Sequence, residues 1–154
     1  GTTAVKCRPN ATNVIIQDSV TSIGTSAFSG CTNLTSVTIG SGVTSIGTSA
    51  FSGCTNLTSV TIPDSVTSIG NYAFSGCTSL TSIVIPDSVR GIGDFAFSNC
   101  PSLSSLTCYA TTEPDIGSRI FDGLPTNGTL YVPNGSDYSR WLSVLGSGWT
   151  IEYL

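Results

Sequence analysis

Residues 66–86 read Val-Thr-Ser-Ile-Gly-Asn-Tyr-Ala-Phe-Ser-Gly-Cys-Thr-Ser-Leu-Thr-Ser-Ile-Val-Ile-Pro, and the same side-chain types recur every 23 residues on either side of this stretch. The recurring sets are Ile23, Ile46, Ile69 and Ile92; Phe28, Phe51, Phe74 and Phe97; Cys31, Cys54, Cys77 and Cys100; and Leu34, Leu57, Leu80 and Leu103. A strict period of this length is typical of a solenoid, in which each coil buries its apolar face against its neighbours.

Each repeat contains a leucine-rich-repeat signature. Residues 57–62 match the pattern L-x-x-L-x-L of these repeats. Alternation along a strand places Val60 and Ile62 inward and Ser59 and Thr61 outward. The sequence therefore predicts a leucine-rich-repeat solenoid, a right-handed β/α superhelix that is rich in β-strand.

Turns connect the predicted strands of each coil. Pro-Asp-Ser at 63–65 favours a turn, and Gly-Ser-Gly at 40–42 replaces it with a turn that we expect to be looser. Residues 71–75 are few enough for a single helical or 3₁₀ turn. The position after this segment exchanges Gly for Asn, which predicts a left-handed backbone conformation. Its four members are Gly30, Gly53, Gly76 and Asn99.

Three parts of the chain follow from this pattern. Residues 1–12 lack the repeat and are expected to cover the first coil, and residues 13–108 form the repeats. Residues 109–154 are expected to form a C-terminal cap, since a solenoid needs an atypical terminal unit over the open end of its core. Within the cap, residues 113–115 are interpreted as a linker.

The cap has its own predicted elements. Residues 130–133 resemble a repeat strand, and apolar residues at helical spacing predict a helix over 136–145 with Ser136 or Asp137 as its N-cap. Residues 149–154 are expected to form a last strand. Both tryptophans, at positions 141 and 149, are expected to plug the core.

The charge distribution excludes several partners. The net charge is −4, and the five basic residues are scattered, whereas binding to nucleic acid requires clustered Lys and Arg. No apolar run approaches the ~18 residues of a membrane-spanning helix. Because Gly1 stands where an initiator Met would be, we expect a mature chain from which any signal peptide has been removed. We expect a monomer.

The repeat pattern Ile-Pro-Asp-Ser-Val-x-x-Ile-Gly-x-x-Ala-Phe-x-Gly-Cys-x-x-Leu-x-x-Ile resembles the BspA-like, Treponema pallidum-type leucine-rich repeats of surface proteins from Bacteroides and other host-associated bacteria. The resemblance covers about residues 13–108, and the tail looks like the C-terminal closing segment of such Bacteroides proteins. It implies an extracellular or cell-surface protein that contacts a host protein or glycan. It supplies no fixed set of ligand residues.

The six cysteines are mostly expected to be core residues. Four of them share one repeat position, where equivalent side chains point in parallel and their Cβ atoms lie too far apart to form disulfides. Cys31, Cys54, Cys77, Cys100 and Cys108 are therefore expected to be free, buried thiols. Cys7 is the cysteine expected to pair or to react.

No enzymatic activity, cofactor or metal is expected. A Ser or Cys nucleophile would lack its usual His base, because the chain contains no His. The chain also has no C-x-x-C spacing, which argues against a zinc site. Asp18, Asp64 and Asp87 are repeat-equivalent turn residues and do not form the convergent carboxylate pair of a glycosidase.

The outward side chains of the main strands are the candidate binding surface. They form two rows, and the predicted site comprises Ser36, Ser59, Ser82 and Ser105 with Thr38, Thr61, Val84 and Thr107. Hydroxyl rows also stabilise a sheet on their own, and this face lacks aromatic, Arg and Met anchors. A binding face and a passive spacer that presents another domain thus both remain open. A solvent-facing cluster involving Tyr72, Arg90 or Phe95 would favour binding.

Ice binding is a remote alternative. Ser and Thr at alternating positions on stacked coils would form a lattice of about 6.6 by 4.8 Å. Val84 interrupts this lattice, and leucine-rich repeats curve, whereas an ice plane requires a flat surface.

Asp-Ser-Val recurs at three turns and resembles the acceptor pattern of Bacteroides O-glycosylation, which makes Ser19, Ser65 and Ser88 candidate acceptors. A repeated turn explains the same pattern without any sugar. If the hypothesis holds, chain expressed in its native host will show added sugar mass by intact mass spectrometry. An unmodified mass would contradict it.

Overall fold

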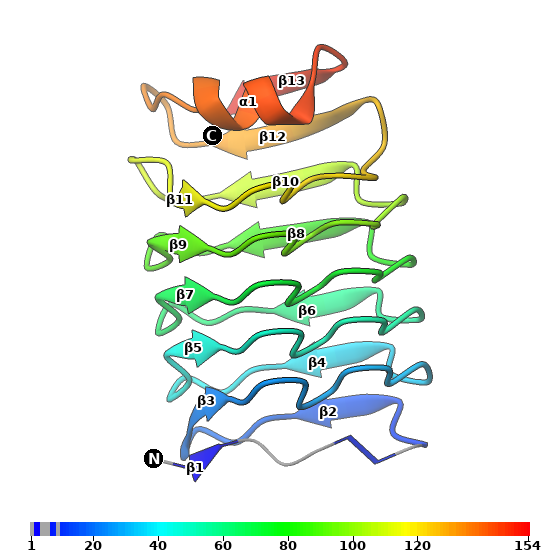
Figure 1. Cartoon of the computed structure of the whole chain (residues 1–154). Coiled ribbons are helices and arrows are strands. Elements are labelled where there is room, and N and C mark those ends of the chain that lie inside the picture. Colours follow the sequence, from blue (N-terminus) through cyan, green and yellow to red (C-terminus); the bar gives the residue numbers. More distant parts are fainter. Residues whose placement is uncertain (1, 4–6, 9) are drawn as a thin grey trace.

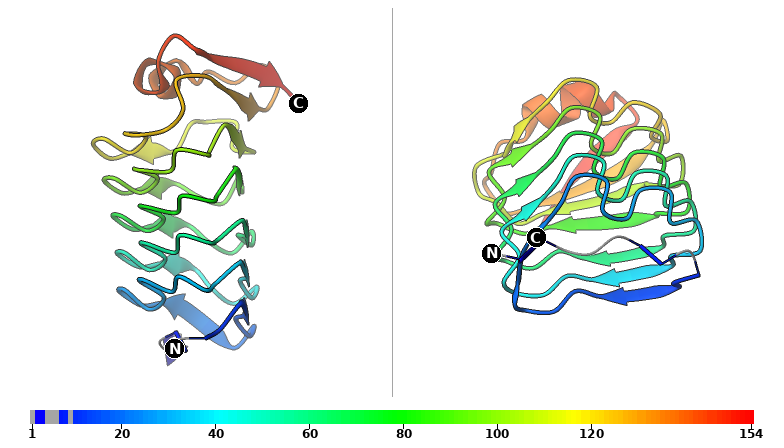
Figure 2. Two further views of the ribbon diagram at one scale, coloured as in Figure 1. Left: turned by 90° about the vertical axis from the view of Figure 1, so that its right-hand side faces the viewer. Right: turned by 60° about the horizontal axis from the view of Figure 1, so that its bottom comes forward.

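The computed structural model describes residues 2–3, 7–8 and 10–154, which form a stack of coils that carry strands on two sides (Figure 1). Residues 1, 4–6 and 9 of the segment expected to cover the first coil lie outside the described residues. Figure 2 shows the coils stacked along one axis, with a helix and a final strand at the C-terminal end. The predicted leucine-rich-repeat solenoid is confirmed.

The main strands form one side of the stack. They are β2 (Asn13–Ile15), β4 (Ser36–Thr38), β6 (Ser59–Thr61), β8 (Ser82–Ile85), β10 (Ser105–Cys108) and β12 (Gly128–Val132). They belong to two sheets, of order β2-β4-β6 and β13-β12-β10-β8, where β13 is Trp149–Tyr153. All pairs are parallel, and equivalent residues of neighbouring repeats are paired, as Val37 is with Val60.

Shorter strands form the second side. They are β1 (Thr2–Thr3), β3 (Val20–Ile23), β5 (Ser45–Ile46), β7 (Ser68–Ile69), β9 (Gly91–Ile92) and β11 (Asp115–Ile116), and they make one six-stranded parallel sheet in this order. Asp115 was expected in a linker, but it begins β11 and so extends this sheet. The reason is that Asp115 N–H bonds to Arg90 O at 3.0 Å, which continues the bonding between coils.

Turns complete each coil. The predicted turn at 63–65 is confirmed by a bond of 3.1 Å from Val66 N–H to Pro63 O. Residues 71–75 form consecutive tight turns, so the expected helical or 3₁₀ turn is absent there. These turns are also bonded between coils: Phe51 N–H donates to Ala73 O, and Phe74 N–H donates to Ala96 O, each at 2.8 Å.

Two backbone positions explain the use of glycine. Gly30, Gly53, Gly76 and Asn99 have φ of 72°, 73°, 74° and 55°, so the predicted left-handed row is confirmed. The prediction of a looser turn at 40–42 is wrong, since Val43 N–H still bonds to Gly40 O at 3.2 Å. Glycine stands there because a Cβ on Gly42 would lie 2.0 Å from Asp18 O.

A column of stacked phenylalanines runs through the core. Ring centroids lie 5.2 Å apart for Phe28 and Phe51, 5.3 Å for Phe51 and Phe74, and 5.5 Å for Phe74 and Phe97. Phe121 extends the column at 6.4 Å, although it is one residue late in the period. The rings are at most 5% exposed, so each coil contributes one apolar layer to a continuous core.

The cap closes this core. Its helix α1 (Ser139–Leu145) begins three residues later than predicted, and the N-cap is Tyr138, which makes no side-chain cap bond. The hydroxyl of Tyr138 is instead buried and donates to Ala110 O at 2.7 Å, while the Asp137 carboxylate accepts from Ser139 N–H at 2.9 Å. No helix in the described part of the chain is long and apolar enough to cross a bilayer.

Both tryptophans serve the cap as predicted. Trp141 is fully buried and packs against Phe121, and Trp149 is 4% exposed. Their indole N–H groups donate to Pro114 O at 3.2 Å and to Pro125 O at 2.9 Å. The cap is therefore held by apolar packing and by satisfied polar groups.

Replacing Phe74 by Ala removes a ring from the middle of the phenylalanine column. We expect the free energy of unfolding to fall by about 3–5 kcal/mol, because the neighbouring rings cannot close the cavity. Urea unfolding followed by circular dichroism measures this loss. Val84→Ala, at an outward position that is 45% exposed, is the matched control and should change stability by less than about 0.5 kcal/mol. Equal losses in the two variants would contradict the assignment of the core.

Candidate functional site

The structure brings the predicted binding residues together in two groups. We call the outward side chains of the main strands the strand face. On it, Ser36 pairs with Ser59 and Thr38 with Thr61, and in the second sheet Ser82 pairs with Ser105 and Val84 with Thr107. Thr38, Ser59, Thr61, Ser82 and Val84 are exposed, whereas Ser36, Ser105 and Thr107 are half-buried.

The first group is uniform in chemistry. Its hydroxyls can donate and accept hydrogen bonds, but they carry no charge and little apolar area. Ser36 Oγ already donates to Asn13 Oδ1, and such cross-strand bonds stabilise the sheet itself. These hydroxyls supply no aromatic or charged anchor, and the large apolar side chain in their row is Ile15, which pairs with Thr38 and is 71% exposed.

The C-terminal part of the strand face differs. The cap continues its rows, since Thr129 pairs with Ser105 and Tyr131 pairs with Thr107. Beyond the end of β10, Tyr109 N–H bonds to Ile85 O at 3.0 Å, and the Tyr109 side chain is 51% exposed. With Val84, these tyrosines give the strand face an apolar and aromatic end.

A cleft of about 550 Å³ adjoins this end, at the corner where the chain leaves β10 for β11. Its lining residues are Asp87, Arg90, Tyr109, Ala110, Thr111, Thr112, Glu113, Pro114 and Asp115. The Arg90 guanidinium donates to the carbonyl oxygens of Asp87 and Val89, which fixes it at the cleft. Glu113 Oε2 is buried and has no hydrogen-bond partner.

The sequence contained a signal for this end of the strand face. Tyr109 stands one repeat after Pro86 and two after Pro63, so a large aromatic side chain replaces proline at the end of the strand. Tyr131 was harder to place because the spacing lengthens from 23 to 24 residues between the phenylalanines at 97 and 121. Residue counting across that change assigns outward positions incorrectly.

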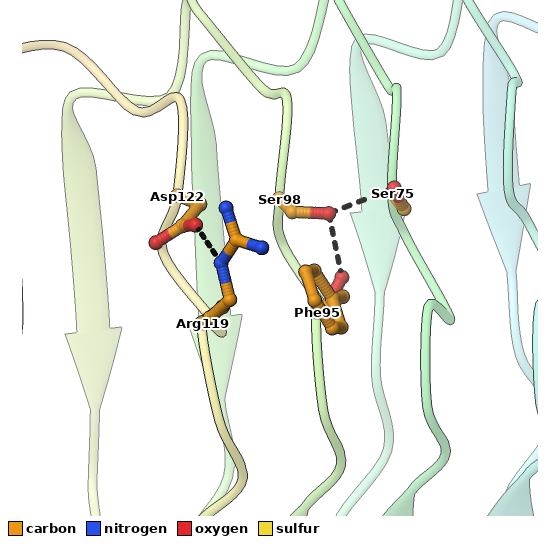
Figure 3. Close-up of polar contacts among 5 residues, drawn as sticks. All are labelled: Ser75, Phe95, Ser98, Arg119 and Asp122. Atoms are coloured by element: carbon orange, nitrogen blue, oxygen red, sulfur yellow. Dashed lines mark hydrogen bonds and ion pairs between the residues drawn. The ribbon is translucent and has the colours of Figure 1, made fainter.

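A second aromatic cluster lies on the turns that follow the second strands. Tyr72 and Phe95 stack with centroids 4.9 Å apart and ring planes 2° apart, and Arg119 Cζ lies 5.2 Å from the Phe95 centroid. Figure 3 shows Arg119 beside both Phe95 and Asp122, and the Arg119 Nε to Asp122 Oδ2 distance is 2.5 Å. Of the three residues expected for a solvent-facing cluster, Tyr72 and Phe95 meet here, and Arg90 lines the cleft.

The cysteines follow the prediction with one exception. Cys54, Cys77, Cys100 and Cys108 are free and buried, and Cys7 pairs, as expected. Cys31 was expected to be free, but it forms a disulfide with Cys7. The argument from parallel side chains fails for this pair because Cys7 precedes the repeats, and the Cα–Cα distance of 6.3 Å suits a disulfide.

The free thiols are buried, hydrogen-bonded and held in the protonated form. Those of Cys54, Cys77 and Cys100 donate to backbone carbonyls of the preceding coil at 3.1, 3.3 and 3.2 Å. Burial raises the pKa of Cys54 and Cys100 to about 11 from an ordinary value of 9.0, and it also raises the pKa of Cys77 and Cys108. No group of three or more Cys, Asp or Glu suited to a metal ion occurs among the described residues.

The hydroxyls of Ser65 and Ser88, two of the candidate glycosylation residues, bond to the preceding coil. Ser65 Oγ donates to Val43 O at 2.6 Å, and Ser88 Oγ donates to Val66 O at 2.7 Å. An O-linked sugar at either position would remove this bond between coils. Ser19 is exposed. Glycosylation stays a prediction.

The stacked coils and their parallel strand face define the class of this protein, the leucine-rich-repeat solenoids. The chain belongs to the BspA type leucine-rich repeat family: the profile of the BspA type Leucine rich repeat region matches residues 2–127 in six copies. The match extends beyond residues 13–108 on both sides. Among curated proteins, none matches the chain.

Solved structures of this kind come from several bacteria. The leucine-rich repeat protein TpLRR of T. pallidum is 33% identical, with 79% of this chain and 59% of that chain covered at a TM-score of 0.69. A leucine-rich repeat protein of Bacteroides ovatus is 31% identical, with 94% of this chain and 42% of that chain covered at a TM-score of 0.65. A leucine-rich cell surface protein of Faecalibacterium prausnitzii is 28% identical, with 95% of this chain and 38% of that chain covered at a TM-score of 0.75. The chain spans less than two thirds of the length of each.

Raised thiol pKa values make stability depend on alkaline pH. Below pH 9 the buried thiols are protonated in both states. Above pH 9 the thiols of the unfolded chain ionise first, which lowers the free energy of the unfolded chain relative to the folded chain. We expect stability to fall between pH 9 and 11, by about 2 kcal/mol for each of Cys54 and Cys100. Urea unfolding across this range, without reductant, measures the slope.

The double variant Cys54→Ala, Cys100→Ala is the control for this slope. It should be less stable at pH 7 but should lose less stability on raising the pH. An unchanged slope would show that these thiols are not the groups responsible.

Proposed function

We propose that this chain is a non-enzymatic interaction module of an extracellular or cell-surface protein, and that it contacts a host protein through the C-terminal end of the strand face. The observation that carries this proposal is the exposed side chain of Tyr109, which is 51% exposed and lines the cleft, at the same end of the strand face as Val84, which is 45% exposed. Membership of a leucine-rich-repeat family supports a binding role. The cell-surface relative from F. prausnitzii supports the location.

The chemistry of this end suits a protein partner. Protein interfaces are centred on aromatic and apolar anchors, and tyrosine is enriched among the residues that dominate binding energy. Tyr109 supplies such an anchor, and the adjoining cleft supplies a concave surface for a partner side chain. Arg90, Glu113 and Asp115 around it provide charged groups that can define the orientation of the partner.

The first strand-face group suits a spacer. Thr38, Ser59 and Thr61 are exposed but provide neither an aromatic ring nor a charge. In this proposal, those coils hold the C-terminal end away from the start of the chain. The two alternatives for the strand face thus apply to different coils of the same solenoid.

Binding of the purified chain to immobilised fibronectin, laminin, fibrinogen and collagen, measured by surface plasmon resonance, tests the proposal. We expect saturable binding to at least one of these proteins. Tyr109→Ala should weaken it by at least about tenfold, because loss of a central tyrosine anchor costs about 1.4 kcal/mol or more.

Two variants serve as controls. Tyr72→Ala removes an exposed tyrosine from a different surface, and Thr61→Arg blocks the hydroxyl part of the strand face; neither should change the affinity. Loss of binding in Thr61→Arg with full binding in Tyr109→Ala would place the contact on the hydroxyl coils and contradict the proposal. No binding to any of the proteins would favour a spacer for the whole chain.

A further inference from the structure

One row of turn residues holds its side chains in a fixed, unusual backbone conformation. The residues are Ser26, Ser49, Tyr72, Phe95 and Arg119, with φ between 54° and 57°. This left-handed region is uncommon for side chains other than Gly, Asn and Asp, and bulky side chains are especially rare in it. Serine at two of these positions shows that the coil itself does not require an aromatic ring there.

The aromatic stack in this row is closed at its C-terminal end. Arg119 covers the outer face of Phe95, and Asp122 holds the Arg119 guanidinium. Figure 3 shows this closure.

The stack is open at its N-terminal end. The next coil towards the N-terminus is bonded directly, since Ser49 N–H donates to Asn71 O at 2.8 Å. Ser49 has no ring to place over Tyr72, and the one ring contact of Tyr72 among the described residues is with Phe95. Tyr72 is 42% exposed. The stack therefore ends at Tyr72: among the described residues no aromatic ring lies over the face of Tyr72 towards the coil of Ser49, which we call its uncovered face.

The spacing of the solenoid defines where a further ring would lie. Rings on successive coils of the phenylalanine column are 5.2–5.5 Å apart. A ligand ring at this distance from Tyr72 would be level with the coil of Ser49. The residues at this position and just before it in the two coils towards the N-terminus all carry hydroxyls: they are Thr48 and Ser49, and Thr25 and Ser26, and three of the four are exposed.

The neutral Ser and Thr residues next to Tyr72 favour an uncharged ligand over a cation. The guanidinium on Phe95 is held by Asp122, but the equivalent residue in the coil of Ser49 is Ser52, so a cation on Tyr72 would lack a carboxylate partner. A pyranose ring carries C–H groups on one face, which suit the negative face of an aromatic ring, and hydroxyls at its edge, which suit Ser and Thr.

We propose that the uncovered face of Tyr72 is a binding site for one pyranose ring of a neutral glycan, with hydroxyls of Ser49 and Thr48 as hydrogen-bond partners. The ligand ring takes the place of the ring that the coil of Ser49 lacks. This site is separate from the cleft beside Tyr109 and does not depend on the protein contact proposed there.

Titration of the chain with the methyl β-glycosides of glucose, galactose and N-acetylglucosamine, followed by NMR of the assigned Tyr72 ring resonances, tests the site. We expect a saturable shift with at least one glycoside, and a Kd on the order of millimolar for a single stacked sugar. Tyr72→Ser should weaken binding at least about tenfold, which corresponds to ~1.4 kcal/mol. This variant should fold, because serine already occupies the same conformation at Ser26 and Ser49.

Two further variants make the result decisive. Ser49→Tyr supplies the missing ring and should abolish binding by covering Tyr72, whereas Tyr109→Ser removes an unrelated exposed tyrosine and should leave the affinity unchanged. The absence of any saturable shift, or unchanged affinity in Tyr72→Ser or Ser49→Tyr, would overturn the proposal. Saturable binding of N-acetyltyrosinamide or N-acetylargininamide without binding of any glycoside would also overturn it.

Discussion

Parallel hydrogen bonding between successive coils, at a repeat of 23 residues, is the constraint on which the rest of the structure depends. Each coil satisfies backbone donors and acceptors on its neighbours, so a shift of one residue would turn every inward side chain outward. The same constraint stacks Phe51 on Phe74 and places the Cys77 thiol under a carbonyl of the preceding coil. Backbone bonding and apolar packing therefore demand the same register.

This register also decides how a distinctive surface can arise. Equivalent positions of successive coils form a row along the solenoid. A side chain that differs in chemistry from the others in its row therefore lies directly beside them. Tyr109 follows two prolines in its row, and Tyr72 and Phe95 follow two serines. Both proposed sites thus arise from replacements within a repeated frame, and the frame keeps its coil-to-coil bonds around them.

The sequence predicts the core and the strands well because the period reports directly which residues share a layer. It fails where the period gives no information. Cys7 lies before the repeats, so its disulfide with Cys31 does not follow from the spacing of the other cysteines. The lengthened spacing before Phe121 obscures the register of Tyr131, which pairs with Thr107 at a separation of 24 residues instead of 23. The left-handed conformation at Tyr72 could not be predicted either, because the serines at the equivalent positions are compatible with many turn types. In the other left-handed row, the exchange of Gly for Asn does predict this conformation.

The buried phenylalanine column and the outer pair of Tyr72 and Phe95 differ in what they contribute to the free energy of folding. The inner phenylalanines are buried, and each provides apolar burial that the solenoid needs. Tyr72 and Phe95 share their left-handed backbone with Ser26 and Ser49, so its cost of about 1–2 kcal/mol per residue is the same with either side chain, and stacking of the two rings returns only about 0.5–1.5 kcal/mol beyond the burial of area. Folding therefore gains little from the outer pair, and serine at the same position of two other coils involves no comparable exposed apolar surface. What the outer rings add is an aromatic surface held rigidly at one place, which is a property of use in recognition.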